Sequence, residues 1–164
     1  MAECWNWDTD LLQNQASKDM WVQLPPQLPN SKTWKTMIFV YNIHEEDHTN
    51  QGENNFYCGR SKEGNPLGNP FSFNGQRTNI AKLSFKTREE AVKAYGIYFD
   101  KMYGKDKELT KAFDEIYEKY KNGEDVYLGC FCKPKMCHAD IIADRLQRKL
   151  IKEKLEEKKN IKQQ

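Results

Sequence analysis

Residues 125–138 read DVYLGCFCKPKMCH, which is the pattern of a strand, a turn and the start of a helix. Residues 125–132 form a largely continuous apolar run, typical of a central strand that is buried on both faces of a parallel sheet. Residues 133–136 contain a proline and indicate a short turn. Beyond His138, apolar residues recur at helical spacing as far as Leu150. The stretch therefore predicts one strand–turn–helix unit of an α/β domain.

The residues upstream supply further strands and helices for this unit. Residues 36–43 and 56–60 are β-branched and aromatic and predict two more strands, and residues 79–85 predict an edge strand. Helices are expected over residues 88–103 and 107–121, because Thr87 and Glu90 have the spacing of a capping box and apolar residues follow at helical intervals. The predicted fold is α/β, with a small, mostly parallel sheet of three to four strands flanked by helices.

Composition divides the chain into three parts: an irregular, Trp-rich N-terminal arm (residues 1–34), an α/β domain (35–150) and a charged helical tail (151–164). The four Trp residues all lie in the arm, among prolines. We expect their rings to pack on the domain; a contact with a second copy of the chain, forming a homo-oligomer, or with another partner is the alternative. The tail is rich in Lys and Glu, and we expect it to be solvated.

Charge and cysteine content narrow the class of protein. The net charge is +2, which argues against a general nucleic-acid binder. No apolar run approaches the roughly 18–20 residues that cross a bilayer, and residues 1–10 lack the pattern of a signal peptide, so no membrane association is expected. The five Cys residues are an odd number, and three of them lie within residues 130–137. These features predict reduced thiols and a cytoplasmic location.

Cys137 and His138 are the first candidates for chemistry. They lie at the predicted start of the last helix, where unpaired N–H groups and the helix dipole favour an anion. A thiol at such a position has a lowered pKa, and a neighbouring imidazole can move a proton. Cys137 and His138 are therefore the candidate catalytic residues, if the protein is an enzyme at all.

The same segment also offers ligands for zinc, and no other cofactor is expected. Side chains alternate along a strand, so Cys130 and Cys132 point to the same side. With Cys137 and His138 they make three thiolates and one imidazole, a legitimate set for zinc, of which Cys132, Cys137 and His138 are the alternative zinc ligands. The spacing C-x-C-x₄-C-H differs from that of paired C-x₂-C knuckles, and a free Cys inside an apolar strand is commonly a core residue. Cys130 is accordingly assigned to the core.

Four motifs give the chain a resemblance to a known family. They are Gly59-Arg60, Gly68-Asn69-Pro70-Phe71, the segment from Thr87 to Ala91, and the Gly-Cys-x-Cys-x-Pro-x-x-Cys-His pattern that ends at His138. In these motifs the chain resembles, over roughly residues 36–148, an uncharacterised family of small bacterial and phage proteins. It departs from the family pattern at Ala139, where a glycine is expected, in a longer loop over 72–86, and in the Trp-rich arm. The resemblance implies no settled activity.

Grouped by the resemblance, Arg60, Asn69, Phe71 and Cys132 are candidate ligand-binding residues at strand ends and loops. A planar guanidinium binds phosphate or carboxylate, although an Arg alone is more often in a surface salt bridge and an Asn in a loop turn. The favoured function is binding of a small anionic ligand, a nucleotide or nucleotide-derived molecule, with or without processing it. One alternative is a non-catalytic phage protein that sequesters a host signalling nucleotide. The other is a structural zinc module that contacts protein or nucleic acid.

Overall fold

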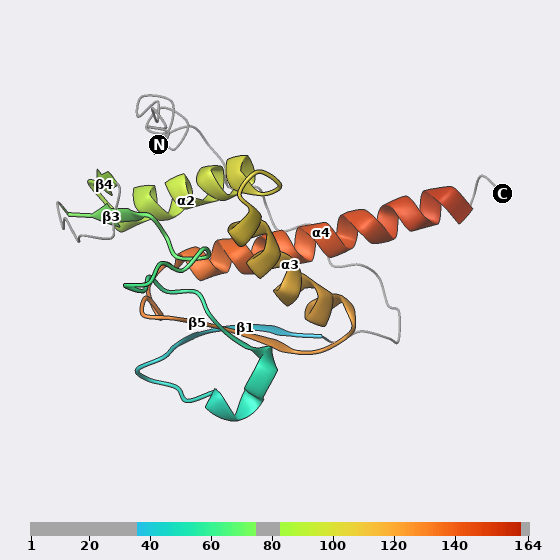
Figure 1. The fold of residues 1–164 in the computed structure, drawn as a ribbon, viewed down its shortest axis with the longest axis horizontal. Helices are drawn as coiled ribbons and strands as arrows, with labels where there is room; N and C mark the ends of the chain where they lie inside the picture. Colours follow the sequence, from blue (N-terminus) through green and yellow to red (C-terminus); the bar gives the residue numbers. More distant parts are fainter. Residues whose placement is uncertain (1–35, 75–82, 162–164) are drawn as a thin grey trace.

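A computed structural model describes residues 36–74 and 83–161 of the chain (Figure 1). The Trp-rich arm, and with it the prediction that its rings pack on the domain, lies outside the described residues. Within them, strands and helices combine as in an α/β protein, which confirms the predicted fold class.

Three strands form the main sheet: β1 (Ile38–Asn42), β2 (Asn55–Tyr57) and β5 (Val126–Cys130). Their order is β1-β5-β2, and both pairings are parallel. Leu128 of β5 lies opposite Val40 on one side and Phe56 on the other. The central position of this apolar strand is confirmed, but the strand ends at Cys130, so Cys132 lies in the turn that follows.

A second, smaller sheet pairs β3 (Phe71–Phe73) with β4 (Leu83–Phe85), again in parallel. β4 coincides with the end of the expected edge strand over 79–85. Phe71 and Phe85 are buried and meet edge to face, with ring centroids 5.5 Å apart. Contacts between β3 and α2 join this small sheet to the helices.

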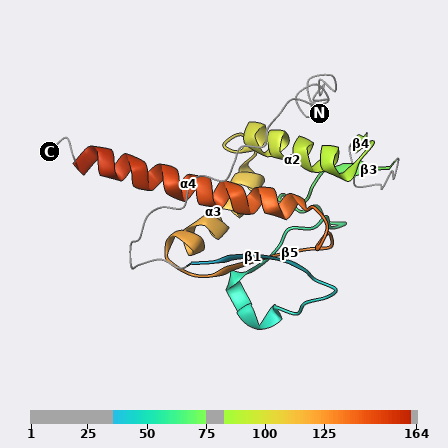
Figure 2. The same ribbon diagram turned by 180° about the vertical axis from the view of Figure 1, so that it is seen from behind.

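Three α-helices cover one side of the main sheet: α2 (Arg88–Met102), α3 (Lys107–Lys121) and α4 (His138–Ile161). A short 3₁₀ segment, η1 (Thr49–Asn54), lies on the opposite side, as Figures 1 and 2 both show. The capping box at the start of α2 is present: the Thr87 hydroxyl accepts the Glu90 N–H at 3.1 Å, and the Glu90 carboxylate accepts the Thr87 N–H at 3.1 Å.

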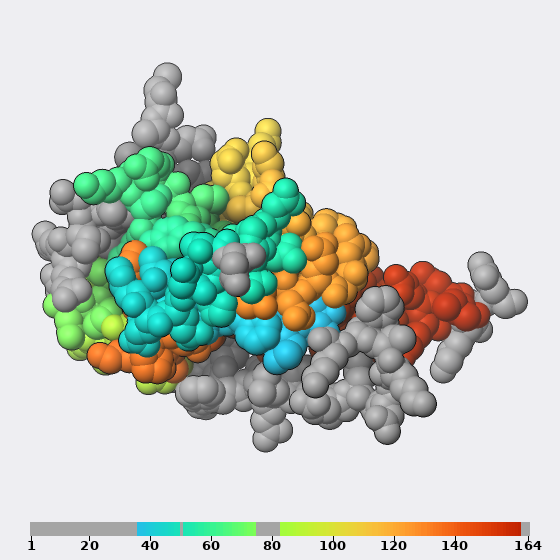
Figure 3. Space-filling model, turned by 90° about the horizontal axis from the view of Figure 1, so that it is seen from below, coloured from blue at the N-terminus to red at the C-terminus, as the bar shows by residue number. Residues whose placement is uncertain are grey.

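The hydrophobic core lies between the helices and the main sheet. Fully buried residues of the core come from α2, α3, α4 and β5, and they include Tyr95, Ile116, Leu146 and Leu128. α4 extends past this core, and every residue from Leu155 to Ile161 is exposed. The C-terminal end of α4 projects from the body of the molecule (Figure 3). In the described part of the chain, no helix combines the length and apolar character needed to cross a membrane.

Candidate metal centre and adjoining cavity

Four side chains from the strand–turn–helix unit converge beneath α2. They are Cys130, Cys132, Cys137 and His138, which together form the Cys/His cluster. The ligand atoms of all four lie within 4.8 Å of one another. Cys130 Sγ is 3.9 Å from Cys132 Sγ and 3.9 Å from His138 Nδ1, and Cys137 Sγ is 4.0 Å from His138 Nδ1. The cluster is therefore a compact set of three sulfur atoms and one nitrogen that could hold a metal ion.

The turn over residues 131–137 brings the two halves of the cluster together. Cys130 is the last residue of β5, and His138 is the first of α4. The Asn42 amide donates to the Lys133 carbonyl at 2.8 Å and so ties the turn to the end of β1. At the other end of the turn, the Asp140 carboxylate accepts the Cys137 N–H at 3.2 Å and pairs with Lys133 Nζ at 2.6 Å. The turn is thus anchored to both a strand and a helix.

The ring of His138 has a fixed orientation. Its Nε2 lies 2.7 Å from the carbonyl oxygen of Cys58, just after β2. A carbonyl can only accept a hydrogen bond, so Nε2 carries the hydrogen, and Nδ1 is the nitrogen that faces the sulfur atoms. The ring also packs edge to face against Tyr95, with centroids 5.0 Å apart, and the residue is only 4% exposed.

The surroundings shift the pKa values of the cluster in opposite directions. Hydrogen bonds from Cys130, and then from Cys137 and His138, lower the pKa of the Cys132 thiol. Hydrogen bonds with Cys130 and Cys132, together with burial, raise the pKa of Cys137, so the lowered pKa expected for a thiol at this helix start is wrong. Burial alone would lower the pKa of His138, but its contacts with Cys130 and Cys132 outweigh burial and raise the pKa to about 9. The cluster therefore favours a thiolate at Cys132, the chemical form that binds a cation.

The four thiols of the described residues differ in access. Cys137 is fully buried, Cys130 is 2% exposed, and Cys132 is half-buried. Cys58 is also fully buried but is not part of the cluster. All four are free cysteines. Cys130 is a core residue, as expected, but its sulfur also belongs to the Cys/His cluster, so assigning it to the core alone was wrong.

A cavity of about 250 Å³ adjoins the cluster. Its wall includes all four candidate ligand-binding residues, together with His138 and three residues that the sequence pattern did not single out: Arg60, Asn69, Phe71, Cys132, His138, Phe73, Arg88 and Phe131. Cys137, the other catalytic candidate, is not among the lining residues. The cavity lies between the loop over residues 68–71, the start of α2 and the cluster.

Two of the lining residues already have roles within the fold. The Asn69 side-chain oxygen accepts the Phe71 N–H at 2.9 Å, which is an Asx turn, and its amide lies 3.4 Å from the Ala91 carbonyl. Arg60 donates from Nη1 to the Phe71 carbonyl at 3.3 Å. Asn69 thus shapes the cavity wall, whereas most of the Arg60 guanidinium hydrogens have no hydrogen-bond partner among residues 36–74 and 83–161.

The start of α4 has fewer free backbone N–H groups for binding an anion than the sequence pattern suggested. The Cys137 N–H donates to Asp140, and the Ala139 N–H lies 3.4 Å from Cys137 Sγ. Two backbone donors are thus engaged within the chain. The cationic groups beside the cavity are instead the side chains of Arg60 and Arg88. Arg88 lies between Thr87 and Glu90 of the capping box of α2. From the sequence, this position indicated only the start of a helix and not a ligand-binding residue.

Comparisons with known proteins place the chain in a family but not in a functional class. No curated protein and no solved structure matches it. Residues 41–148, more than half of the chain, match a protein family, and this range contains the Cys/His cluster and every residue named above as lining the cavity. The chain therefore belongs to the family described as a domain of unknown function (DUF4326).

Proposed function

We propose that the protein is a zinc-binding domain in which Cys130, Cys132, Cys137 and His138 hold one Zn²⁺ ion. The observation that carries this proposal is the convergence of three sulfur atoms and one imidazole nitrogen within 4.8 Å of one another. Such a set of ligands, Cys₃His, is one that structural zinc sites use.

The separations between the ligand atoms support a tetrahedral ion. With Zn–S bonds of about 2.3 Å and Zn–N bonds of about 2.0–2.1 Å, tetrahedral geometry puts two sulfurs about 3.8 Å apart and a sulfur and a nitrogen about 3.6 Å apart. The Cys130 Sγ–Cys132 Sγ and Cys130 Sγ–His138 Nδ1 separations are both 3.9 Å. A contraction of a few tenths of an ångström would complete these two contacts, whereas the widest separations in the cluster, of up to 4.8 Å, would have to shorten by up to about 1 Å.

The surroundings of His138 support the same conclusion. Metal-bound imidazoles usually donate the hydrogen of their other nitrogen to a carbonyl or carboxylate, which fixes the ring toward the metal. His138 makes this contact with the Cys58 carbonyl at 2.7 Å. Thiolates and imidazole in a tetrahedral S₃N set favour zinc over hard cations such as Mg²⁺ or Ca²⁺.

A zinc ion at this position would be structural. Four protein ligands fill its coordination sphere, whereas a catalytic zinc keeps one position open. The ion would join the end of β5 to the start of α4 and, through His138, to the segment after β2. In this proposal Cys137 and His138 are metal ligands rather than a nucleophile and a proton carrier. Reduced thiolates also require a reducing compartment, such as the cytoplasm.

The proposal is tested by the metal content of the full chain, purified without a metal-affinity column. We expect one zinc per chain, measured by inductively coupled plasma mass spectrometry. Cobalt substitution should give the intense visible bands of tetrahedral thiolate coordination. Cys137→Ser and His138→Asn should both lose the metal and melt at a lower temperature, because the metal stabilises only the folded chain.

Cys58→Ala is the matched control. Cys58 is as buried as Cys137, but its thiol lies outside the cluster. This variant loses a similar thiol from the core and should keep its zinc. An unaltered chain that binds neither zinc nor cobalt when either is supplied in excess would overturn the proposal.

A further inference from the structure

We infer that the cavity beside the Cys/His cluster binds a small phosphate monoester that carries a ring. This inference goes beyond the zinc proposal, because it concerns a cavity whose two arginines lie outside the Cys/His cluster, although Cys132 and His138 also form part of its wall. The carrying observation is a pair of arginines, Arg60 and Arg88, that line one cavity of about 250 Å³ without a carboxylate partner in the described part of the chain.

The contacts of these two arginines differ from those of the other arginines in residues 36–74 and 83–161. Arg145 pairs with Asp100 and Asp144, and Arg148 pairs with Asp144. Arg60 instead makes one 3.3 Å hydrogen bond to a carbonyl, and the Arg88 guanidinium lies over the Phe73 ring, 4.5 Å from its centroid. Neither contact neutralises the positive charge, so the cavity has two cationic groups available for a ligand.

Two guanidinium groups match a phosphate better than a carboxylate. Each guanidinium presents parallel N–H donors that fit two oxygens of an anion. A carboxylate has one charge and two oxygens, which a single fork already satisfies. A phosphate monoester carries up to two charges and three terminal oxygens, so both arginines can bind it. A zinc ion with three thiolates would bring one net negative charge to the wall, which the two arginines still exceed.

The other residues of the cavity wall favour a particular kind of group attached to the phosphate. Phe71, Val92 and Phe131 add apolar surface, and Phe131 is 47% exposed. Apolar and aromatic walls with a few polar groups are typical of sites for ring-containing molecules. The volume lies below the range of about 300–1,000 Å³ that is usual for drug-sized ligands. It suits one ring with one phosphate, such as part of a nucleotide, and is too small to enclose a dinucleotide.

The cavity is largely preformed by contacts that do not involve a ligand. The Asx turn of Asn69 fixes the loop before Phe71, and the Tyr95 hydroxyl donates to the Leu67 carbonyl at 2.9 Å. The capping box sets the start of α2 and hence the backbone of Arg88. Such preorganisation lowers the entropy that binding would otherwise cost.

The inference is tested by calorimetric titration of the full chain, supplied with zinc, with phenyl phosphate. Benzoate and phenol at equal ionic strength are the comparison ligands. We expect phenyl phosphate to bind, benzoate to bind more weakly, and phenol not to bind. Arg60→Gln and Arg88→Gln should each weaken phenyl phosphate binding about ten- to a hundredfold, the loss expected for one charge-assisted contact.

Lys62→Gln is the matched control, because it removes an exposed positive charge near Arg60 that does not line the cavity. Its affinity should be unchanged. Absence of binding, equal binding of benzoate, or equal weakening by Lys62→Gln would overturn the inference. The comparison of ligands on the unaltered chain decides the matter even if a variant fails to fold.

Zinc content measured on the same samples separates the two proposals. A chain that holds zinc but does not bind phenyl phosphate contradicts only the ligand site. A chain that binds phenyl phosphate but takes up no zinc contradicts only the metal site.

Discussion

Gly129 in the central strand allows two neighbouring strands to be joined over its surface. Tyr41 of β1 donates its hydroxyl to the Asn55 side chain of β2 at 2.7 Å. To reach Asn55, the Tyr41 ring passes over Gly129, and a Cβ atom there would lie 2.8 Å from both the Tyr41 hydroxyl and Ile43 Cγ2. The absence of a side chain at Gly129 is therefore needed for this contact, and Gly129 directly precedes Cys130 in β5.

Gly129→Ala is expected to destabilise the protein by about 1–3 kcal/mol, the usual cost of overpacking a tight site. The Tyr41 ring and Ile43 would have to move, and the hydrogen bond to Asn55 would be lost. Chemical denaturation measures the change in the free energy of unfolding. Gly96→Ala in α2 is the control: its Cβ would meet Ile141 Cγ2 at an ordinary 3.6 Å, so it should be neutral or slightly stabilising. Equal effects of the two substitutions would contradict the argument.

Cys130 shows why the candidate site could be predicted only in part. The sulfur atoms of Cys130 and Cys132 do lie close together, 3.9 Å apart, but β5 ends at Cys130, so the turn rather than strand alternation places Cys132. The path of the turn after the strand could not be derived from local pattern, because it depends on distant anchors such as the Asn42 amide. That path brings His138 Nδ1 to the Cys130 sulfur. A residue with the pattern of core packing therefore also has a ligand atom in the cluster.

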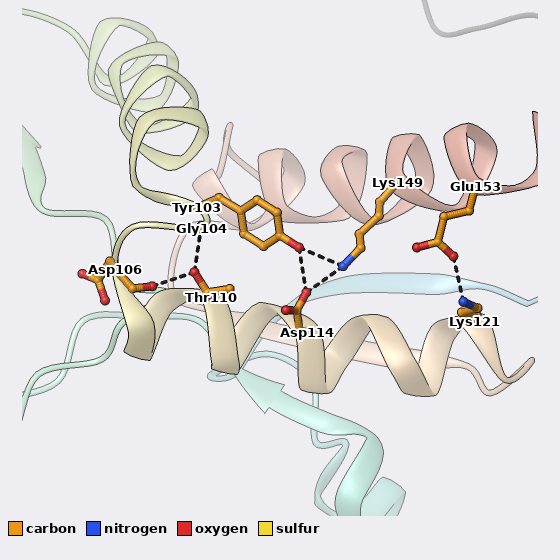
Figure 4. A network of polar contacts seen from close by, with 8 residues as sticks. All are labelled: Tyr103, Gly104, Asp106, Thr110, Asp114, Lys121, Lys149 and Glu153. Atoms are coloured by element: carbon orange, nitrogen blue, oxygen red, sulfur yellow. Dashed lines mark hydrogen bonds and ion pairs between the residues drawn. The ribbon is translucent and has the colours of Figure 1, made fainter. Parts of the chain in front are cut away.

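At the scale of elements, α3 is held to α4 by a set of polar contacts that is flanked by aromatic rings. Lys149 Nζ donates to Asp114 Oδ1 at 2.7 Å and to the Tyr103 hydroxyl at 2.8 Å, and Tyr103 donates to Asp114 at 2.8 Å (Figure 4). The ammonium group also lies 4.2 Å from the centroid of the Tyr117 ring. A second ion pair, Lys121 with Glu153 at 2.8 Å, joins the same helices further along. These contacts fix how α4 lies across α3.

Lys149→Met should cost about 1 kcal/mol of unfolding free energy at neutral pH, because Asp114 loses its cation while solvent screens part of the effect. Burial opposes the charge of Lys149, but Asp114 and Tyr103 prevail and raise its pKa above the usual value. A raised pKa means that the stabilisation is complete below the unfolded pKa of about 10.4 and is lost as the pH rises through the folded pKa. The difference between the two proteins should therefore be larger at about pH 8 than at about pH 11.

Urea denaturation at both pH values measures this difference. Lys152→Met is the control, since Lys152 is exposed and lies on the same helix less than a turn away. It should change the unfolding free energy little at either pH. A pH-independent cost of Lys149→Met would show that the loss comes from packing rather than from charge.

At the scale of the whole molecule, the buried core is built from the same segments in which the sequence shows regularly spaced or continuous apolar residues. The buried stripes of α2, α3 and α4 and the central place of β5 follow from spacing and apolar content, so they were predictable. The strands expected over 56–60 and 79–85 correspond to β2 and β4, whereas β3 was not predicted, because its three residues are too few for a periodic signal. The cavity was predicted through its motif residues, but Arg88 was not, because its place beside Arg60 is set by how α2 packs.

The charged end of α4 should be dispensable. Residues 156–161 are all exposed, and the Lys121–Glu153 ion pair precedes them. Deleting residues 156–164 is expected to change the melting temperature by no more than about 2 °C. Deleting residues 150–164, which also removes Leu150 and Glu153, should lower it clearly more. A loss of several degrees with the shorter deletion would show that this segment packs, for example on a second copy of the chain.

The strand order β1-β5-β2 has a consequence for the way the chain folds as it is synthesised. β1 and β2 are made early, but neither pairs with the other, and among the described strands each has β5 as its neighbour in the main sheet. Residues 38–57 must therefore wait, with their strand edges unpaired, until residues 126–130 leave the ribosome. Such long-range pairing is slow and leaves exposed edges that invite aggregation. Of the helices that cover the main sheet, α2 and α3 are the two made during this interval, because both precede β5 in the chain.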